Sequence, residues 1–124
     1  MPVLTDYARN LMTRALCARA PSLPTAVYAA LGTGGTVAAG ISGEPAGNGY
    51  ARQRVVFTGT GPQRNAEAAR FVFTAAAGTL THIGLYDAAS GGNALAYGPL
   101  AQTAPILGAG TVTIAAETLT VSAE

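Results

Sequence analysis

The chain has 124 residues, which suits one domain, and only 10% of them are charged, against about a quarter in typical globular domains. Its seven cations are all arginine and six acids leave a net charge of +1, so the clustered positive charge of a nucleic-acid-binding protein is missing. A single cysteine, Cys17, excludes an internal disulfide framework, and no apolar run reaches the roughly 18 residues that a membrane span needs.

The low charge also says something about the surface. Because 49% of the residues are hydrophobic, much of the surface must consist of alanine, threonine, glycine, serine and apolar groups. A surface of this kind promotes self-association unless neighbouring subunits cover it, so we expect an oligomer or a larger assembly. An alanine-rich composition inherited from a GC-rich genome is the alternative explanation. The first residues lack the basic and apolar regions of a secretory signal, so we expect the protein to be made and kept in the cytoplasm until assembly.

The first predicted element is an amphipathic helix over residues 4–18. Thr5 or Asp6 is suited to cap its start, and Pro21 and Pro24 begin an extended link after its end. The helix precedes all the predicted strands, so its apolar stripe either lies across an edge or open face of the sheet or docks on a neighbouring subunit. The stripe recurs at helical spacing: Leu4, Tyr7, Ala8, Leu11, Met12, Ala15 and Leu16. Three members are candidate partner-binding residues: Tyr7, Leu11 and Met12.

After the link the periodicity changes from that of a helix to that of strands. Glycine-rich stretches at 32–35 and 40–49 are predicted loops, and 59–63 is a predicted turn. About seven or eight short strands predict an antiparallel β-sandwich or barrel-like domain over residues 25–124. With the helix, it makes one structural domain, 1–124. The strand candidates are 25–31, 50–58, 66–75, 80–86, 95–100, 105–107, 111–115 and 118–122.

Few side chains are suited to catalysis or metal binding. The chain has one histidine, His82, and a structural role is favoured for it because no second group is in place to orient it. Asp87, Ser90 and Asn93 resemble oxygen donors of a calcium loop, but one carboxylate is too few, and a turn between strands explains the same residues. We therefore predict no enzyme activity, no catalytic residues, no metal site and no cofactor.

Arginine and tyrosine side chains are the remaining binding candidates. Arg52 and Arg54 lie on one strand face, where they can pair with Glu67, with Asp87 or with acids of a partner chain. Aromatic rings can also stack on sugars, although the chain has no tryptophan, which weakens a carbohydrate platform. The tyrosines considered for partner or sugar binding are Tyr50, Tyr86 and Tyr97.

Several phrases, taken in their order along the chain, resemble a family of small virion proteins of tailed bacteriophages, the tail-fibre or capsid-fibre proteins. The lysine-free composition is similar to that of their relatives in gene transfer agents of alphaproteobacteria. Leu80 and Ile83 replace a bulkier aromatic pattern of other members, which weakens an inherited sugar-binding role. The phrases that carry the resemblance lie at 47–52, 65–68, 79–88, 90–100, 108–114 and 118–121.

The resemblance implies a non-enzymatic virion protein, with a particle assembled in the bacterial cytoplasm. It implies most specifically the base of a head spike, bound to the major capsid protein and holding a spike or fibre protein. Such a base is a homo-oligomer, a pentamer at a capsid vertex or a trimer within a fibre. The alternatives are a tail or baseplate fibre adaptor and a receptor- or glycan-binding module.

Overall fold

A computed structural model describes residues 3–122, so the outermost residues of the predicted domain, 1–2 and 123–124, lie outside it. Within that range there are one helix, α1 (Asp6–Leu16), and twelve strands, all paired antiparallel. The prediction of a mainly β, antiparallel domain with one helix near its N-terminus is confirmed. The strands are β1 (Val3–Leu4), β2 (Val27–Gly32), β3 (Gly34–Thr36), β4 (Gly40–Ser42), β5 (Gln53–Val55), β6 (Phe57–Thr58), β7 (Gln63–Asn65), β8 (Ala69–Phe73), β9 (Gly78–Tyr86), β10 (Ala94–Ile106), β11 (Gly110–Ile114) and β12 (Thr120–Val121).

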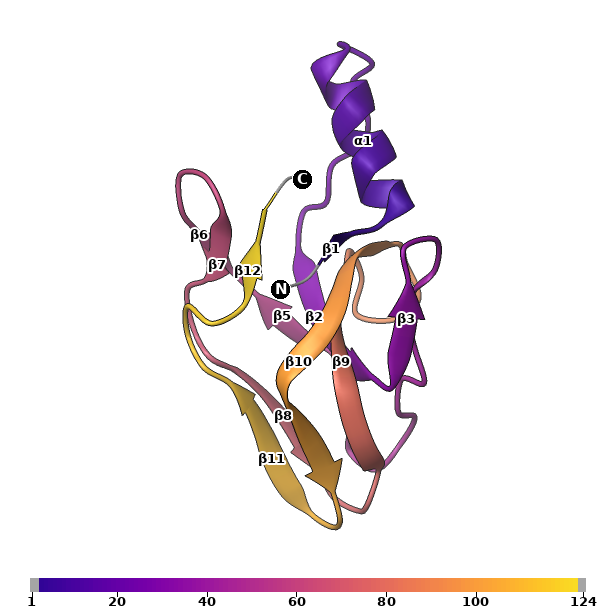
Figure 1. The fold of residues 1–124 in the computed structure, drawn as a ribbon, viewed down its shortest axis with the longest axis vertical. Coiled ribbons are helices and arrows are strands. Elements are labelled where there is room, and N and C mark those ends of the chain that lie inside the picture. Colours follow the sequence, from indigo (N-terminus) through magenta and orange to yellow (C-terminus); the bar gives the residue numbers. More distant parts are fainter. Residues whose placement is uncertain (1–2, 123–124) are drawn as a thin grey trace.

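The strands form two main layers (Figure 1). One layer is a five-stranded sheet in the order β1-β10-β9-β2-β5. The other consists of the β8–β11 pair together with the β12–β7–β6 sheet. β5 and β6 are separated only by Val56, so this short stretch passes from one layer to the other along one edge. The layers do not close into a barrel, which excludes the barrel alternative and leaves an open sandwich.

The hydrophobic core lies between these layers. In β8, Ala69, Phe71 and Phe73 are buried while Arg70 and Val72 are exposed, which is the alternation predicted from the sequence. The sheet on the other side contributes buried residues of β2, β9 and β10. Successive side chains of a strand point to opposite faces, so every second residue of β8 enters the core.

Asn65 links the end of β7 to residues 115–119, in the gap between two strand pairings. On one side of this gap β7 pairs with β12, and on the other side β8 pairs with β11. Its side-chain amide donates to the carbonyls of Glu67 and Ala115, both at 2.9 Å, and its Oδ1 accepts from the Leu119 amide at 2.9 Å. The Asn65 backbone adds bonds with Leu119 and Glu117. The strand registers on the two sides of this point differ by one residue, as at a β-bulge. One fully buried amide therefore satisfies the backbone groups that the interruption leaves without ladder partners.

Two predictions about the N-terminal half are wrong. The helix does not precede all the strands, because Val3–Leu4 forms β1 and pairs with Tyr97 and Ala96 of β10. Leu4 therefore belongs to a strand, and a two-residue strand is too short to show a periodic pattern. The glycine-rich stretch that was predicted as loops contains the hairpin β3–β4. Its glycines have a packing role, since a Cβ at Gly35 would lie 2.7 Å from the Tyr97 ring.

The strand count and several boundaries also differ from the prediction. The predicted strands 95–100 and 105–107 are one long strand, β10, with an irregular register between Pro99 and Ala104. The predicted strand 50–58 begins later and divides into β5 and β6, and the predicted turn 59–63 ends in β7. In a sequence, prolines such as those of β10 usually indicate the end of a strand, yet edge positions and bulges tolerate proline.

Candidate partner-binding surfaces

The first surface that the sequence singled out, the apolar stripe of α1, lies partly against its own chain. Thr5 caps the helix, with its Oγ1 accepting from the Ala8 amide at 3.3 Å and donating to the Ala94 carbonyl at 2.6 Å. Leu11 is only 7% exposed, and Tyr7 and Met12 are half-buried. The N-terminal half of α1 thus packs on the body near β10, and a role of these three residues in partner binding stays a prediction.

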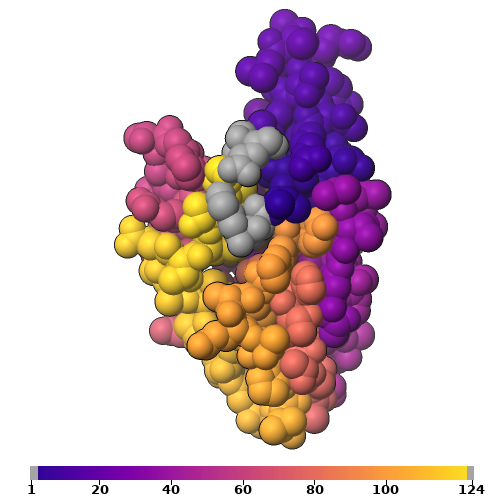
Figure 2. Space-filling view, in the orientation of Figure 1, coloured from indigo at the N-terminus to yellow at the C-terminus, as the bar shows by residue number. Residues whose placement is uncertain are grey.

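The C-terminal end of α1 is different, because it projects beyond the rest of the domain (Figures 1 and 2). We call residues 16–23 the helix tip. Leu16 is 87% exposed and Leu23 is 60% exposed, so two large apolar side chains lie in solvent. Ala18 and Ala20 both have positive φ, at 59° and 49°, which costs a non-glycine residue about 1 kcal/mol or more. The tip is therefore an apolar and conformationally strained projection.

A second group of predicted residues forms a cluster around Arg52, which lies just before β5. Its Nε and Nη2 donate to the two carboxylate oxygens of Glu44, at 2.8 and 2.9 Å. Its Nη1 donates to the carbonyls of Ala88 and Gly91, at 3.0 and 2.8 Å. The guanidinium also lies over the ring of Tyr86, 3.9 Å from the centroid. Arg52 therefore ties the 44–52 segment to the turn after β9, and we call this group the Arg52 clamp.

The acid that pairs with Arg52 is Glu44, whereas Glu67 and Asp87 were the candidates within the chain. Asp87 instead closes its own turn, accepting from the backbone and side-chain amides of Asn93 at 2.7 and 3.1 Å. These bonds agree with the turn interpretation of this loop. Arg54 is exposed on β5, and its role in partner binding stays a prediction.

Tyr50 also belongs to the Arg52 clamp, because it contacts Glu44. Its hydroxyl donates to Glu44 at 2.6 Å and accepts from the Leu31 amide at 3.0 Å. Burial raises the pKa of Tyr50, and the hydrogen bond to Glu44 raises it further. Burial alone would raise the pKa of Glu44, but the hydrogen bonds from Arg52 and Tyr50 outweigh it, so that pKa lies below its usual value. The clamp thus holds a charged carboxylate inside the loop cluster.

The three tyrosines considered for sugar stacking have their rings engaged within the chain. Tyr50 stacks on Phe71 and Phe73, with ring centroids 6.2 and 5.9 Å apart. Tyr86 is buried beneath Arg52, and Tyr97 packs in a small cluster with it. An aromatic platform for sugars needs exposed ring faces, so these contacts favour a structural role for the tyrosines.

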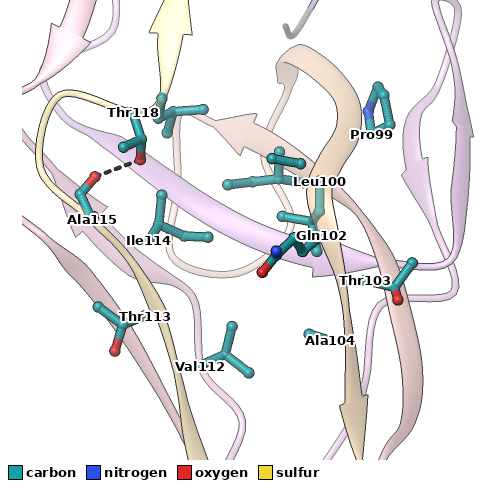
Figure 3. Close-up of a pocket in the computed structure, with 13 residues that line it drawn as sticks. Pro99, Leu100, Gln102, Thr103, Ala104, Val112, Thr113, Ile114, Ala115 and Thr118 are labelled. Atoms are coloured by element: carbon teal, nitrogen blue, oxygen red, sulfur yellow. Dashed lines mark hydrogen bonds between the residues drawn. The ribbon is translucent and has the colours of Figure 1, made fainter.

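A hollow of the described surface lies between β10 and β11, with a volume of about 730 Å³ (Figure 3). We call it the β10–β11 groove. These strands follow each other along the chain but do not pair: among the strands of residues 3–122, β11 pairs only with β8, and Leu100–Thr103 lies in the irregular part of β10. Side chains of Leu100, Val112 and Ile114 point into the space between the strands, against the core. None of the described residues that line the groove is ionisable.

Glu44, the groove and the projecting tip were missed by the sequence reasoning. Glu44 lies in a glycine- and proline-rich stretch with no periodic pattern, and only its position near the Tyr50–Arg52 pair gave any signal. The groove depends on two neighbouring strands that fail to pair, which no local pattern reports. The exposed leucines of the tip follow the same helical spacing as the buried ones, so the stripe gave no means to separate them.

The described part of the chain also lacks other marks of a chemical site. Among residues 3–122 there is no helix with both the length and the apolar character needed to cross a membrane. Within the same range, no three histidine, cysteine, aspartate or glutamate side chains gather as a metal site would require. What remains is a mainly β domain of the open-sandwich class, with an uncharged groove, a projecting apolar tip and polar side chains engaged within the fold.

Comparison with known proteins gives this class a family. The family described as Podophage GP4 fiber I protein gp80 matches residues 3–122. Because the match covers nearly the whole chain, the chain belongs to this family of phage virion fibre proteins, and a structural role as a virion component follows. The resemblance to bacteriophage tail-fibre or capsid-fibre proteins is confirmed at this level. No curated protein matches the chain.

Proposed function

We propose that this protein is the base of a head spike on a tailed-phage-like particle or gene transfer agent, where it attaches a fibre to the capsid. The observation that carries the proposal is that the end of α1 and the β10–β11 connection lie at opposite ends of the long axis (Figure 1), and each has a large exposed apolar side chain. Leu16, 87% exposed, lies at the helix end, and Leu107, 86% exposed, lies in the β10–β11 connection at the opposite end. A connector needs two separate surfaces, and family membership supports fibre attachment.

The partners in this proposal are the major capsid protein on one side and a spike or fibre protein on the other. The chain acts as a homo-oligomer, with five copies at a capsid vertex or three copies within a fibre segment. The low charge of the chain supports it, since apolar and uncharged surface favours burial between subunits. Assembly takes place in the bacterial cytoplasm before the particle leaves the cell.

The test is to locate the chain on the particle by electron microscopy. A compact tag inserted between Gly61 and Pro62 lies in an exposed turn after β6, where a Cβ at Gly61 would meet nothing within 4 Å. Extra density at the capsid vertices is the expected result. Density at the tail tip alone would refute the head-spike proposal and favour a tail or baseplate adaptor, the runner-up.

A matched control separates a tag that is present but not seen from a tagged chain that fails to assemble. The same tag placed between Gly91 and Gly92 lies in the turn held by the Arg52 clamp, so it disturbs a contact that the Gly61 insertion leaves intact. The Gly61 insertion should enter particles at the untagged level. If neither the untagged nor the tagged chain is found in purified particles, the virion role itself is refuted.

A further inference from the structure

The groove and the helix tip have complementary properties on one molecule. The β10–β11 groove is an apolar hollow of about 730 Å³, within the range of clefts that hold a bound group. The tip presents most of the Leu16 and Leu23 side chains to solvent, at 87% and 60% exposure. Seating these leucines in an apolar hollow would remove their exposed area from water, which favours the contact.

Charge at the edges of these two surfaces is complementary as well. The groove ends at the turn Ala115–Thr118, which includes the exposed acid Glu117. The tip has Arg14 just before it and Arg19 within it, both exposed. Opposite charges thus lie beside the two surfaces and can form an ion pair at the rim of a contact between them. Such a rim pair contributes little affinity but favours one orientation.

The end of α1 fixes the backbone from which the tip projects. Ala18, the first residue after the helix cap, has a left-handed conformation, and the Arg19 amide donates to the Arg14 carbonyl at 2.8 Å. This pattern is common where helices end. The chain's own hydrogen bonds therefore hold the turn that presents the tip.

We propose that copies of this chain associate head to tail, with the helix tip of one copy seated in the β10–β11 groove of the next. The contact uses two different patches, so it is heterologous and closes into a ring when the rotation between copies allows it. The occupant of the groove is thus a second copy. The inference names the surfaces of the homo-oligomer in the proposed function, and rests on that function only for the ring's place on the particle.

The test is a pair of variants measured by sedimentation and then mixed. The tip variant is Leu16→Asp with Leu23→Asp, and the groove variant is Ala101→Arg with Gln102→Arg. All four positions are exposed, so folding should persist, which far-UV circular dichroism and urea unfolding check. Each lost leucine contact weakens association about tenfold or more, so the tip variant should bind about a hundredfold more weakly.

The mixture gives the decisive result. Each variant alone lacks one half of the contact and should be monomeric at concentrations where the wild type associates. Mixed together, they retain one intact tip and one intact groove, so they should form a one-to-one heterodimer and stop there. Val72→Asp, on an exposed position of β8, is the control and should leave association unchanged.

Several outcomes would overturn the proposal. A wild type that stays monomeric at micromolar concentration removes the self-contact, while the location of the chain on the particle is judged separately by microscopy. A tip variant that still associates shows that the leucines are not in the contact. Monomeric variants whose mixture also stays monomeric indicate that the groove pairs with another groove or another partner, which contradicts the head-to-tail arrangement.

Discussion

Asn65 offers the sharpest test of what holds the second layer together. Asn65→Leu keeps a side chain of similar size but removes three hydrogen bonds, to Glu67, Ala115 and Leu119. The Leu119 amide lies in a buried residue, so leaving it unpaired costs about 1–3 kcal/mol. Losing the bonds to the carbonyls of Ala115 and Glu67 costs less, because the Ala115 carbonyl keeps a 2.6 Å bond from Thr118 and Glu67 is exposed. We expect the free energy of unfolding to fall by about 2–4 kcal/mol.

The assay is urea unfolding followed by tyrosine fluorescence and far-UV circular dichroism, at one fixed protein concentration because association shifts apparent stability. The matched control is Asn10→Leu, on an exposed position of α1, which should change stability by less than about 0.5 kcal/mol. A loss of unfolding free energy below about 1 kcal/mol for Asn65→Leu would show that the amide does not stabilise the break between the strand pairings, and would refute the reasoning.

Asn65→Asp separates hydrogen bonding from side-chain shape. The introduced carboxyl group retains the acceptor for Leu119 but faces two carbonyl oxygens, so burial and repulsion raise its pKa above the unfolded value. A raised folded pKa means that stability is greatest at low pH and is lost as the pH rises through that value. The stability gap between this variant and the wild type should therefore widen from about pH 4 to pH 7. A gap independent of pH would mean that the side chain escapes to solvent.

Three further predictions concern the clamp and the close packing of β9. Arg52→Lys keeps the charge but loses the two-pronged contact with Glu44, so the unfolding free energy in urea should fall by about 1.5–3 kcal/mol, whereas an unchanged midpoint would contradict the clamp. Because the folded pKa of Glu44 is lowered, its stabilisation is present above the unfolded pKa and lost as the pH falls through the folded value. Stability should thus decline on acidification below about pH 4, and Glu44→Gln should flatten this decline; equal pH profiles would refute the assignment. Gly84→Ala puts a Cβ 2.7 Å from Ile41 and should cost about 1–3 kcal/mol, while Gly108→Ala, with nothing within 4 Å, should leave the thermal midpoint unchanged.

The sequence predicted the layers of this domain better than their connections. The alternation around Phe71 and Phe73 gave the core face of β8, and Thr5 was among the expected caps of the helix. These features depend on local periodicity and on capping, which a short window of residues contains. The five-stranded order and the passage of the chain at Val56 depend on pairing between distant residues, and no local window contains that information.

The candidate site was predictable only in part, for a related reason. Arg52, Tyr50 and Tyr86 were singled out as chemically capable side chains, and the structure brings them together with Glu44. Their mutual contacts depend on a loop of glycine and proline residues whose path has no periodic signature. The groove is formed by an absence of pairing between β10 and β11, which no residue type reports.

The uncharged lining of the β10–β11 groove has a consequence for the head-to-tail association proposed above. An interface without buried ions depends on the removal of apolar surface from water, and this driving force weakens on cooling. Added salt screens only the exposed rim pair, so moderate ionic strength should change affinity little. The affinity between copies should therefore rise on warming from low temperature and change little as the salt concentration increases. A particle component with such contacts would stay assembled in fresh water and in sea water alike.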